Sequence, residues 1–215
     1  MSIKAAPRHR RDRAHGTDQA GGARGNERLT AMTGAVLLVL LAAEGVTILF
    51  KREMMTLHFF IGMRLVGPVL LKVGSTGYWF VRYYTGSEPY VRKGPPALLL
   101  RLLGPVVIAT SAGVIGSGIA LAVAGPRSPQ WIFVHKATFV LWFGAMFVHV
   151  LWYAPQLPRL LRRGSAGRER VRAVLAGAGR RWLLLTAALA VGLVIALATY
   201  QLAGPWTGFL ARGGG

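Results

Sequence analysis

The sequence predicts an all-α membrane protein: a polytopic helical bundle with five transmembrane helices, the N-terminus inside and the C-terminus outside. The first observation is composition, because the 215 residues are 53% hydrophobic and only 15% charged, with a mean hydropathy of +0.44. Soluble domains are less apolar and more charged. The second observation is five apolar runs, each reaching the roughly 20 residues that cross a bilayer. The third is that Lys and Arg gather in alternate links between the runs.

The apolar runs lie at about residues 29–50, 55–80, 97–124, 131–154 and 182–203. Each is expected to be helical, because lipid offers no hydrogen-bond partner for free backbone groups. Gly67-Pro68 predicts a kink in the second run. The whole chain divides into a disordered basic cytoplasmic tail over 1–28, a transmembrane bundle over 29–203 with a basic cytoplasmic loop over 155–181, and a short extracytoplasmic tail over 204–215.

The basic residues predict the orientation of the bundle. Seven lie within 1–28, and eight arginines lie between Arg159 and Arg181. The opposite side carries Lys51, Arg52, Arg127 and Arg212. The positive-inside rule therefore places the N-terminus in the cytoplasm, and the second and fourth helices both run from outside to inside. A multi-pass location in the cell inner (plasma) membrane follows.

The formal net charge of +19 bears on possible partners. The charges lie between apolar runs, which favours contact with anionic lipid. The basic segments have no interleaved aromatic residues and no recognisable module, so nucleic acid is not expected as a partner. The chain has no cysteine, which excludes disulfides, thiolate metal sites, iron–sulfur clusters and covalent c-type haem.

Two histidines lie in the apolar run "WIFVHKATFVLWFGAMFVHVLWY" (131–153). His135 and His149 are fourteen residues apart, which places them on nearly one helix face and about 21 Å apart along the axis. His58 lies at the depth of His135 on a helix that runs the same way. Two imidazoles at one depth on parallel helices can bind a haem iron from opposite sides. At the level of His149 the second helix carries Lys72 instead.

A single transmembrane histidine can also simply hydrogen-bond to a neighbouring helix. The joint pattern of His58, His135 and His149, two of them matched in depth, favours these three as iron ligands. The sequence thus predicts a haem-binding bundle, with one haem b near the outer face and a second haem left open.

Charged residues inside the apolar runs are candidates for function, because charge is costly there. Glu44 either accepts the Nδ1 proton of an axial histidine or pairs with Arg64. Arg64 or Lys136 can hold a haem propionate. For Lys72 three interpretations stay open: it ligates a second haem opposite His149, contacts a propionate, or directs its amine toward the inner surface.

The stretches "LHFFIGMRLVGPVLLKVGSTGYWFVRYYTG", "YVRKGPP", "LLRLLGP" and "WIFVHKATFVLWFGAMFVHV" resemble an actinobacterial group of cytochrome b561-like integral membrane proteins. More broadly, the chain is similar to the four-helix b-type cytochromes that partner hydrogenases, formate dehydrogenases and other oxidoreductases. The resemblance covers about residues 54–154. It implies non-covalent haem b, transmembrane electron transfer, often involving a quinone, and axial roles for His58, His135 and His149. The chain departs from the dihaem pattern at Lys72.

The expected function is therefore that of a membrane b-type cytochrome, which carries electrons between a quinone pool or membrane donor and a partner redox protein. Whether the chain is itself an enzyme stays open: a second interpretation is a haem enzyme acting on quinone, superoxide or ferric iron. A third is a haem-free structural or transport subunit, in which the intramembrane charges and histidines form a polar network.

Overall fold

The computed structural model describes residues 22–92, 94, 98–153 and 177–213. Every regular element in these residues is helical. The predicted tail 1–28 and basic loop 155–181 lie mostly outside the described residues. In chain order the elements are α2 (Ala23–Leu49), α3 (Lys51–Tyr84), α4 (Glu88–Val91), α5 (Leu98–Ala124), α6 (Pro129–Tyr153), α9 (Ala178–Thr199), the 3-10 helix η2 (Tyr200–Ala203) and α10 (Gly204–Ala211).

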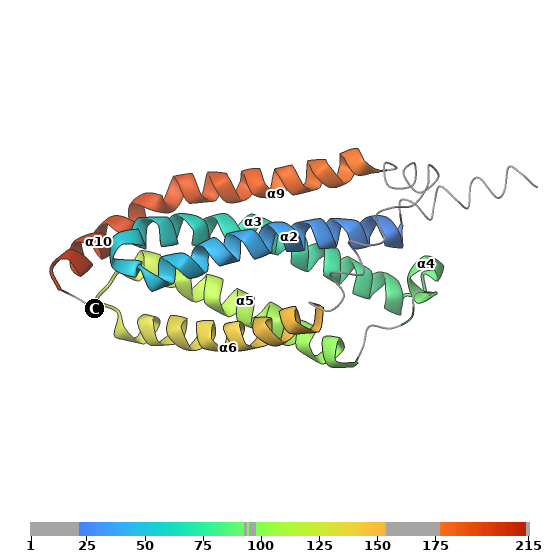
Figure 1. Ribbon diagram of the computed structural model, residues 1–215, viewed down its shortest axis with the longest axis horizontal. Helices are drawn as coiled ribbons and strands as arrows, with labels where there is room; N and C mark the ends of the chain where they lie inside the picture. Colours follow the sequence, from blue (N-terminus) through green and yellow to red (C-terminus); the bar gives the residue numbers. More distant parts are fainter. Residues whose placement is uncertain (1–21, 93, 95–97, 154–176, 214–215) are drawn as a thin grey trace, which may run out of the picture.

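The five long helices lie side by side along one axis (Figure 1). The described residues contain five helices that are long and apolar enough to cross a membrane, which confirms the predicted all-α, multi-pass fold. Helices α3 and α6 run in the same direction, and α2, α5 and α9 run the opposite way (Figure 1). The predicted parallel course of the second and fourth helices is thereby confirmed.

The helices form two packed groups that share few contacts. Helix α3 packs closely against α2 and α9, and α5 packs closely against α6, whereas α3 touches α5 only sparsely. One apolar cluster, Leu37, Ile61 and Leu65, joins α2 to α3. A second cluster, Met63, Ala122 and Ala196, joins α3, α5 and α9. The α5–α6 pair is therefore anchored to the rest of the bundle at a small area near the end of α5.

The α3–α9 interface depends on two glycines that bring the backbones together. A Cβ atom at Gly67 would lie 2.0 Å from the carbonyl oxygen of Ala188, and one at Gly192 would lie 2.2 Å from that of Arg64. Pro68 has no N–H, so the Arg64 carbonyl lacks its usual intrahelical donor. Gly192 packs directly on that carbonyl, where a weak Cα–H···O contact fits. The departure from helical dihedrals inside α3 is at Met54 (φ −110°, ψ 17°), near its start, not at Gly67-Pro68.

Two boundaries differ from the sequence-based expectation. Helix α2 begins at Ala23, inside the predicted tail, where the side-chain amide of Asn26 donates to the Ser75 carbonyl at 2.8 Å. At the other end, residues 204–211 form α10, which packs on α3 with Trp206 against Phe59 at 6.2 Å between ring centroids. Both segments gain helical structure because they have α3 to pack against.

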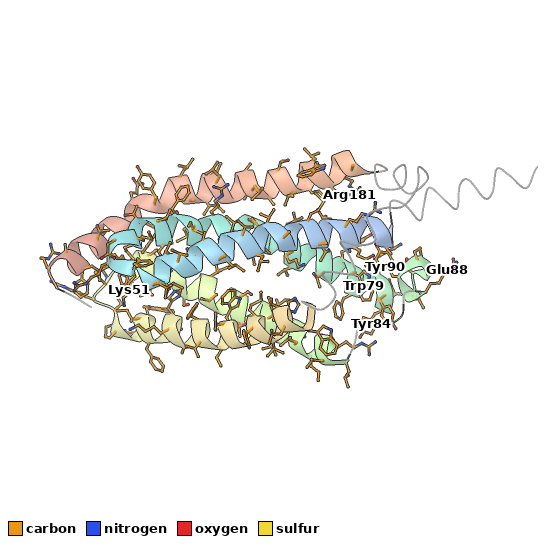
Figure 2. The ribbon with its side chains drawn as sticks, viewed as in Figure 1. Lys51, Trp79, Tyr84, Glu88, Tyr90 and Arg181 are labelled. Carbon is orange, nitrogen blue, oxygen red and sulfur yellow. The ribbon has the colours of Figure 1, made fainter. Side chains whose placement is uncertain are left out.

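Aromatic side chains gather where α3 ends and α4 begins. Tyr90 is 2% exposed and lies edge-on to Tyr78 and Trp79, and Trp79 stacks on Tyr83 at 5.5 Å. Figure 2 shows Trp79, Tyr84, Tyr90 and Arg181 at one end of the bundle and Lys51 at the other. Aromatic belts of this kind are typical of the border between lipid and water.

Candidate functional site

His58, on α3, is held by two residues near the end of α2. Its Nδ1 atom lies 2.9 Å from Oε1 of Glu44 and 3.1 Å from Oγ1 of Thr47. Because a carboxylate accepts and does not donate, Nδ1 carries the ring proton and donates it. In the neutral ring this leaves Nε2 without a proton, so that its lone pair can bind a ligand.

The local sequence explains why Glu44 sits in this position. Thr47, 1% exposed, donates its hydroxyl to the Glu44 carbonyl at 2.6 Å, which leaves its oxygen free to accept from His58. Gly62 lies one turn beyond His58, and a Cβ atom there would come within 3.3 Å of Oε1 of Glu44. The missing side chain at Gly62 therefore makes room for the carboxylate. Of the two predicted partners for Glu44, the structure has the histidine and not Arg64.

His135, on α6, is held in the same way by α5. Its Nδ1 lies 3.0 Å from Oγ of Ser117, a residue 4% exposed. The Ser117 hydroxyl has the Val114 carbonyl as an acceptor at 3.2 Å, so its oxygen can accept the Nδ1 proton. The ring rests on Gly118, where a Cβ atom would lie 3.2 Å from Cε1. Ser117 also lies 3.2 Å from Thr138, which follows one turn after His135.

His58 and His135 lie on α3 and α6, the two long helices that run in the same direction (Figure 1). In both cases the side-chain hydrogen bonds involve Nδ1, and Nε2 is the other ring nitrogen that a ligand could reach. Proteins usually fix the tautomer of a metal-ligating histidine by a hydrogen bond from the ring nitrogen that does not bind the metal to an oxygen acceptor. The structure thus places the first predicted pair, His58 and His135, on parallel helices, each with its Nδ1 atom in a hydrogen bond.

Lys72, on α3, and His149, on α6, form the second predicted pair. The Lys72 ammonium, however, donates to the Thr30 carbonyl on α2 at 2.8 Å, and it lies over Gly34. Ser75 donates to the Lys72 carbonyl at 3.0 Å and lies 2.9 Å from the Thr30 hydroxyl. Lys72 therefore links α3 to α2, and its Nζ atom acts as a hydrogen-bond donor to the Thr30 carbonyl.

The two other predicted cofactor-binding residues lie on different faces. Arg64 lines a cavity between α2, α3 and α9, to which α6 does not contribute. Lys136 follows His135 directly and is exposed. Of these two cations, Lys136 is the one beside the histidine pair.

Sequence reasoning missed the hydroxyl groups of Thr47 and Ser117. The sequence offered a way to find them, because each is a small polar residue inside an apolar run. Trp142, seven residues after His135, donates to Ser111 on α5 at 3.0 Å, so it belongs to the α5–α6 interface.

Comparisons of the chain with protein-family models, curated proteins and solved structures found no match. Among the described residues there is also no group of three or more His, Cys, Asp or Glu side chains that could hold a bare metal ion. A haem iron takes its equatorial nitrogens from the porphyrin and needs only axial ligands from protein. The imidazole nitrogens of His58 and His135 are donor atoms of this kind.

Proposed function

We propose that this chain is a membrane b-type cytochrome, which binds one haem b between His58 and His135 and carries electrons between a membrane donor and a partner redox protein. The observation that carries the proposal is the pair of imidazoles on parallel helices, each with Nδ1 held and Nε2 left for a ligand. When bound, haem b supplies one-electron redox chemistry within the bilayer. A quinone as donor is part of this proposal.

The protein's own residues would do two things for the haem. His58 and His135 would hold the haem iron, and Glu44 and Ser117 would fix the orientation of their rings. Lys136, exposed beside His135, is the cation suited to a propionate. The Lys72 ammonium is bonded to Thr30, which favours one haem over two.

The arrangement of polar groups disfavours a proton path along α2 and α3. One polar cluster contains Glu44, Thr47 and His58, and the other contains Thr30, Lys72 and Ser75. The apolar cluster of Leu37, Ile61 and Leu65 joins the same two helices. Proton relays consist of linked polar groups, so the electron carrier is the better interpretation of this site.

The test of the proposed function uses the purified full chain in detergent. We expect about one haem per chain and a b-type reduced-minus-oxidised spectrum, reducible by a quinol analogue without steady turnover. Sustained turnover of quinone, superoxide or ferric iron by the chain alone would instead make it an enzyme. A folded but colourless protein, after expression with excess haem, would reject haem altogether.

Replacing Glu44 by Gln should raise the reduction potential of the haem. The carboxylate on Nδ1 makes His58 more electron-rich, which stabilises ferric iron, and a neutral amide does this less well. A tenfold change in that preference corresponds to about 59 mV for one electron. Potentiometric titration of the variant measures the shift, with Glu53→Gln on the exposed start of α3 as control. An unchanged potential with Glu44→Gln would contradict the assigned role of Glu44.

A further inference from the structure

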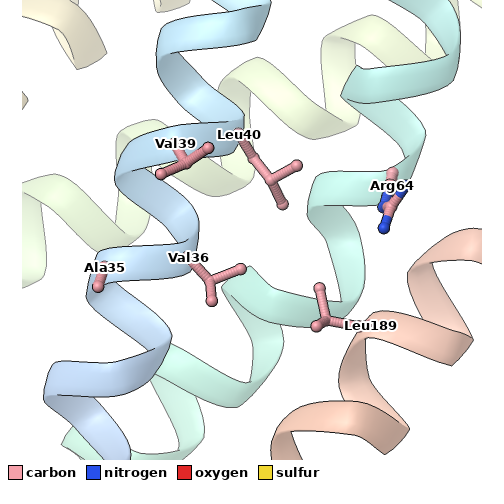
Figure 3. Close-up of a pocket in the computed structure, with 6 residues that line it drawn as sticks. All are labelled: Ala35, Val36, Val39, Leu40, Arg64 and Leu189. Carbon is pink, nitrogen blue, oxygen red and sulfur yellow. The ribbon is translucent and has the colours of Figure 1, made fainter.

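A cavity of about 390 Å³ lies over α3 between α2 and α9, away from the histidine pair. Figure 3 shows Arg64 on α3, with Val36, Val39 and Leu40 on α2 to one side and Leu189 on α9 to the other. Ala35 completes the lining. The cavity is therefore an aliphatic groove that carries a single cation.

Arg64 has no anion within the groove. Glu44, the other charge in the neighbouring apolar run, is committed to His58 at 2.9 Å. The Nε atom of Arg64 is buried, and no described residue forms a hydrogen bond with it. A buried guanidinium N–H without an acceptor costs free energy that an acidic ligand would recover.

The depth of Arg64 makes this arrangement unusual. The residue lies thirteen positions after Lys51, or about 20 Å along the helix axis from the start of α3. Charged side chains at such positions in membrane helices normally pair with an opposite charge or line a polar pathway. The other side chains that line the groove are aliphatic, so an apolar molecule that carries an anion would match both the lining and the charge.

We propose that this groove binds a single-chain amphiphile with a carboxylate head, such as a long-chain fatty-acid anion, with Arg64 as the anchor of the carboxylate. The cavity volume is at the small end of the roughly 300–1,000 Å³ range of ligand sites, which suits one alkyl chain and not two. The Arg64 fork matches a carboxylate in two parallel hydrogen bonds. The α2 side chains and Leu189 would cover the alkyl chain of the ligand. This site is independent of the proposed haem.

Equilibrium binding of radiolabelled palmitate to the purified full chain tests the proposal, with methyl palmitate as a neutral competitor. We expect the acid to bind at least tenfold more tightly than the ester, a preference that Arg64→Gln abolishes and Arg64→Lys partly keeps. Arg52→Gln is the matched control, because Arg52 is an exposed cation on the same helix and should leave binding unchanged. Ala35→Phe fills the groove without altering charge, and it should weaken both ligands.

Three results would overturn the proposal. The first is equal affinity for acid and ester, and the second is a preference for the acid that survives Arg64→Gln in a variant that elutes and melts like the wild type. The third is displacement of palmitate by phosphatidylglycerol at equal concentration, which would identify a two-chain phospholipid as the occupant. A normal haem content in Arg64→Gln is expected in every case, so failure here leaves the haem proposal standing.

Discussion

Replacing Gly67 by Ala is expected to destabilise the bundle by about 3 kcal/mol or more, the upper range for overpacking. The added Cβ would lie 2.0 Å from the carbonyl oxygen of Ala188. The obstacle is backbone, so no side chain can turn away to relieve the clash, and α9 must move as a whole. Gly192→Ala should have a similar effect, since its Cβ would meet the Arg64 carbonyl at 2.2 Å.

The measurement is thermal unfolding of the purified variants in detergent, followed by tryptophan fluorescence and gel filtration. A loss of 3 kcal/mol in a chain of this size lowers the melting temperature by about 6–12 °C. Gly74→Ala and Gly77→Ala provide matched controls on the same helix, because a Cβ at either position meets nothing within 4 Å. These controls should be neutral or stabilising by up to about 1 kcal/mol. Equal melting of Gly67→Ala and Gly74→Ala would show that the α3–α9 contact is wrong.

Replacing either His58 or His135 by Ala should remove the haem. Loss of a group that merely orients a ligand weakens metal binding by about 10–100-fold, and loss of the ligand itself should exceed that. The haem-to-chain ratio after purification, with the visible spectrum, measures the effect. His149→Ala is the control on the same helix, and it should retain the haem between the other two histidines. A b-type spectrum that survives in both single variants would reject the pair as axial ligands.

The five helices could be predicted because they depend on local quantities, whereas the depth of the histidines stays a prediction. Hydropathy and length identify a membrane span, and the fixed rise per residue places His58 and His135 at one level. The orientation of the bundle in its membrane stays a prediction from the distribution of Lys and Arg.

The partners of each side chain could not be predicted, because periodicity gives a helix face and not the neighbour on that face. Glu44 had His58 and Arg64 as candidate partners, and the register of α2 against α3 decides for His58. The glycines show the same limit. Gly67 and Gly192 are tightly packed in the structure, whereas Gly74 faces open space, and nothing in the sequence separates them.

The tail expected over residues 204–215 contains a helix. Proline is well tolerated in the first turn of a helix, and Pro205 lies in the first turn of α10. The chain continues through the 3-10 turn η2 into α10, and Trp206 reaches Phe59, the neighbour of His58. The end of the described chain is thus part of the packing beside the proposed haem site.

If imidazoles from two separate helices bind one iron, electron paramagnetic resonance of the oxidised protein should detect both ligands. We expect a low-spin ferric signal typical of two imidazole ligands, which Glu44→Gln perturbs and His149→Ala leaves unchanged. A high-spin signal from a haem with one histidine, or a low-spin signal that persists without His58, would contradict it.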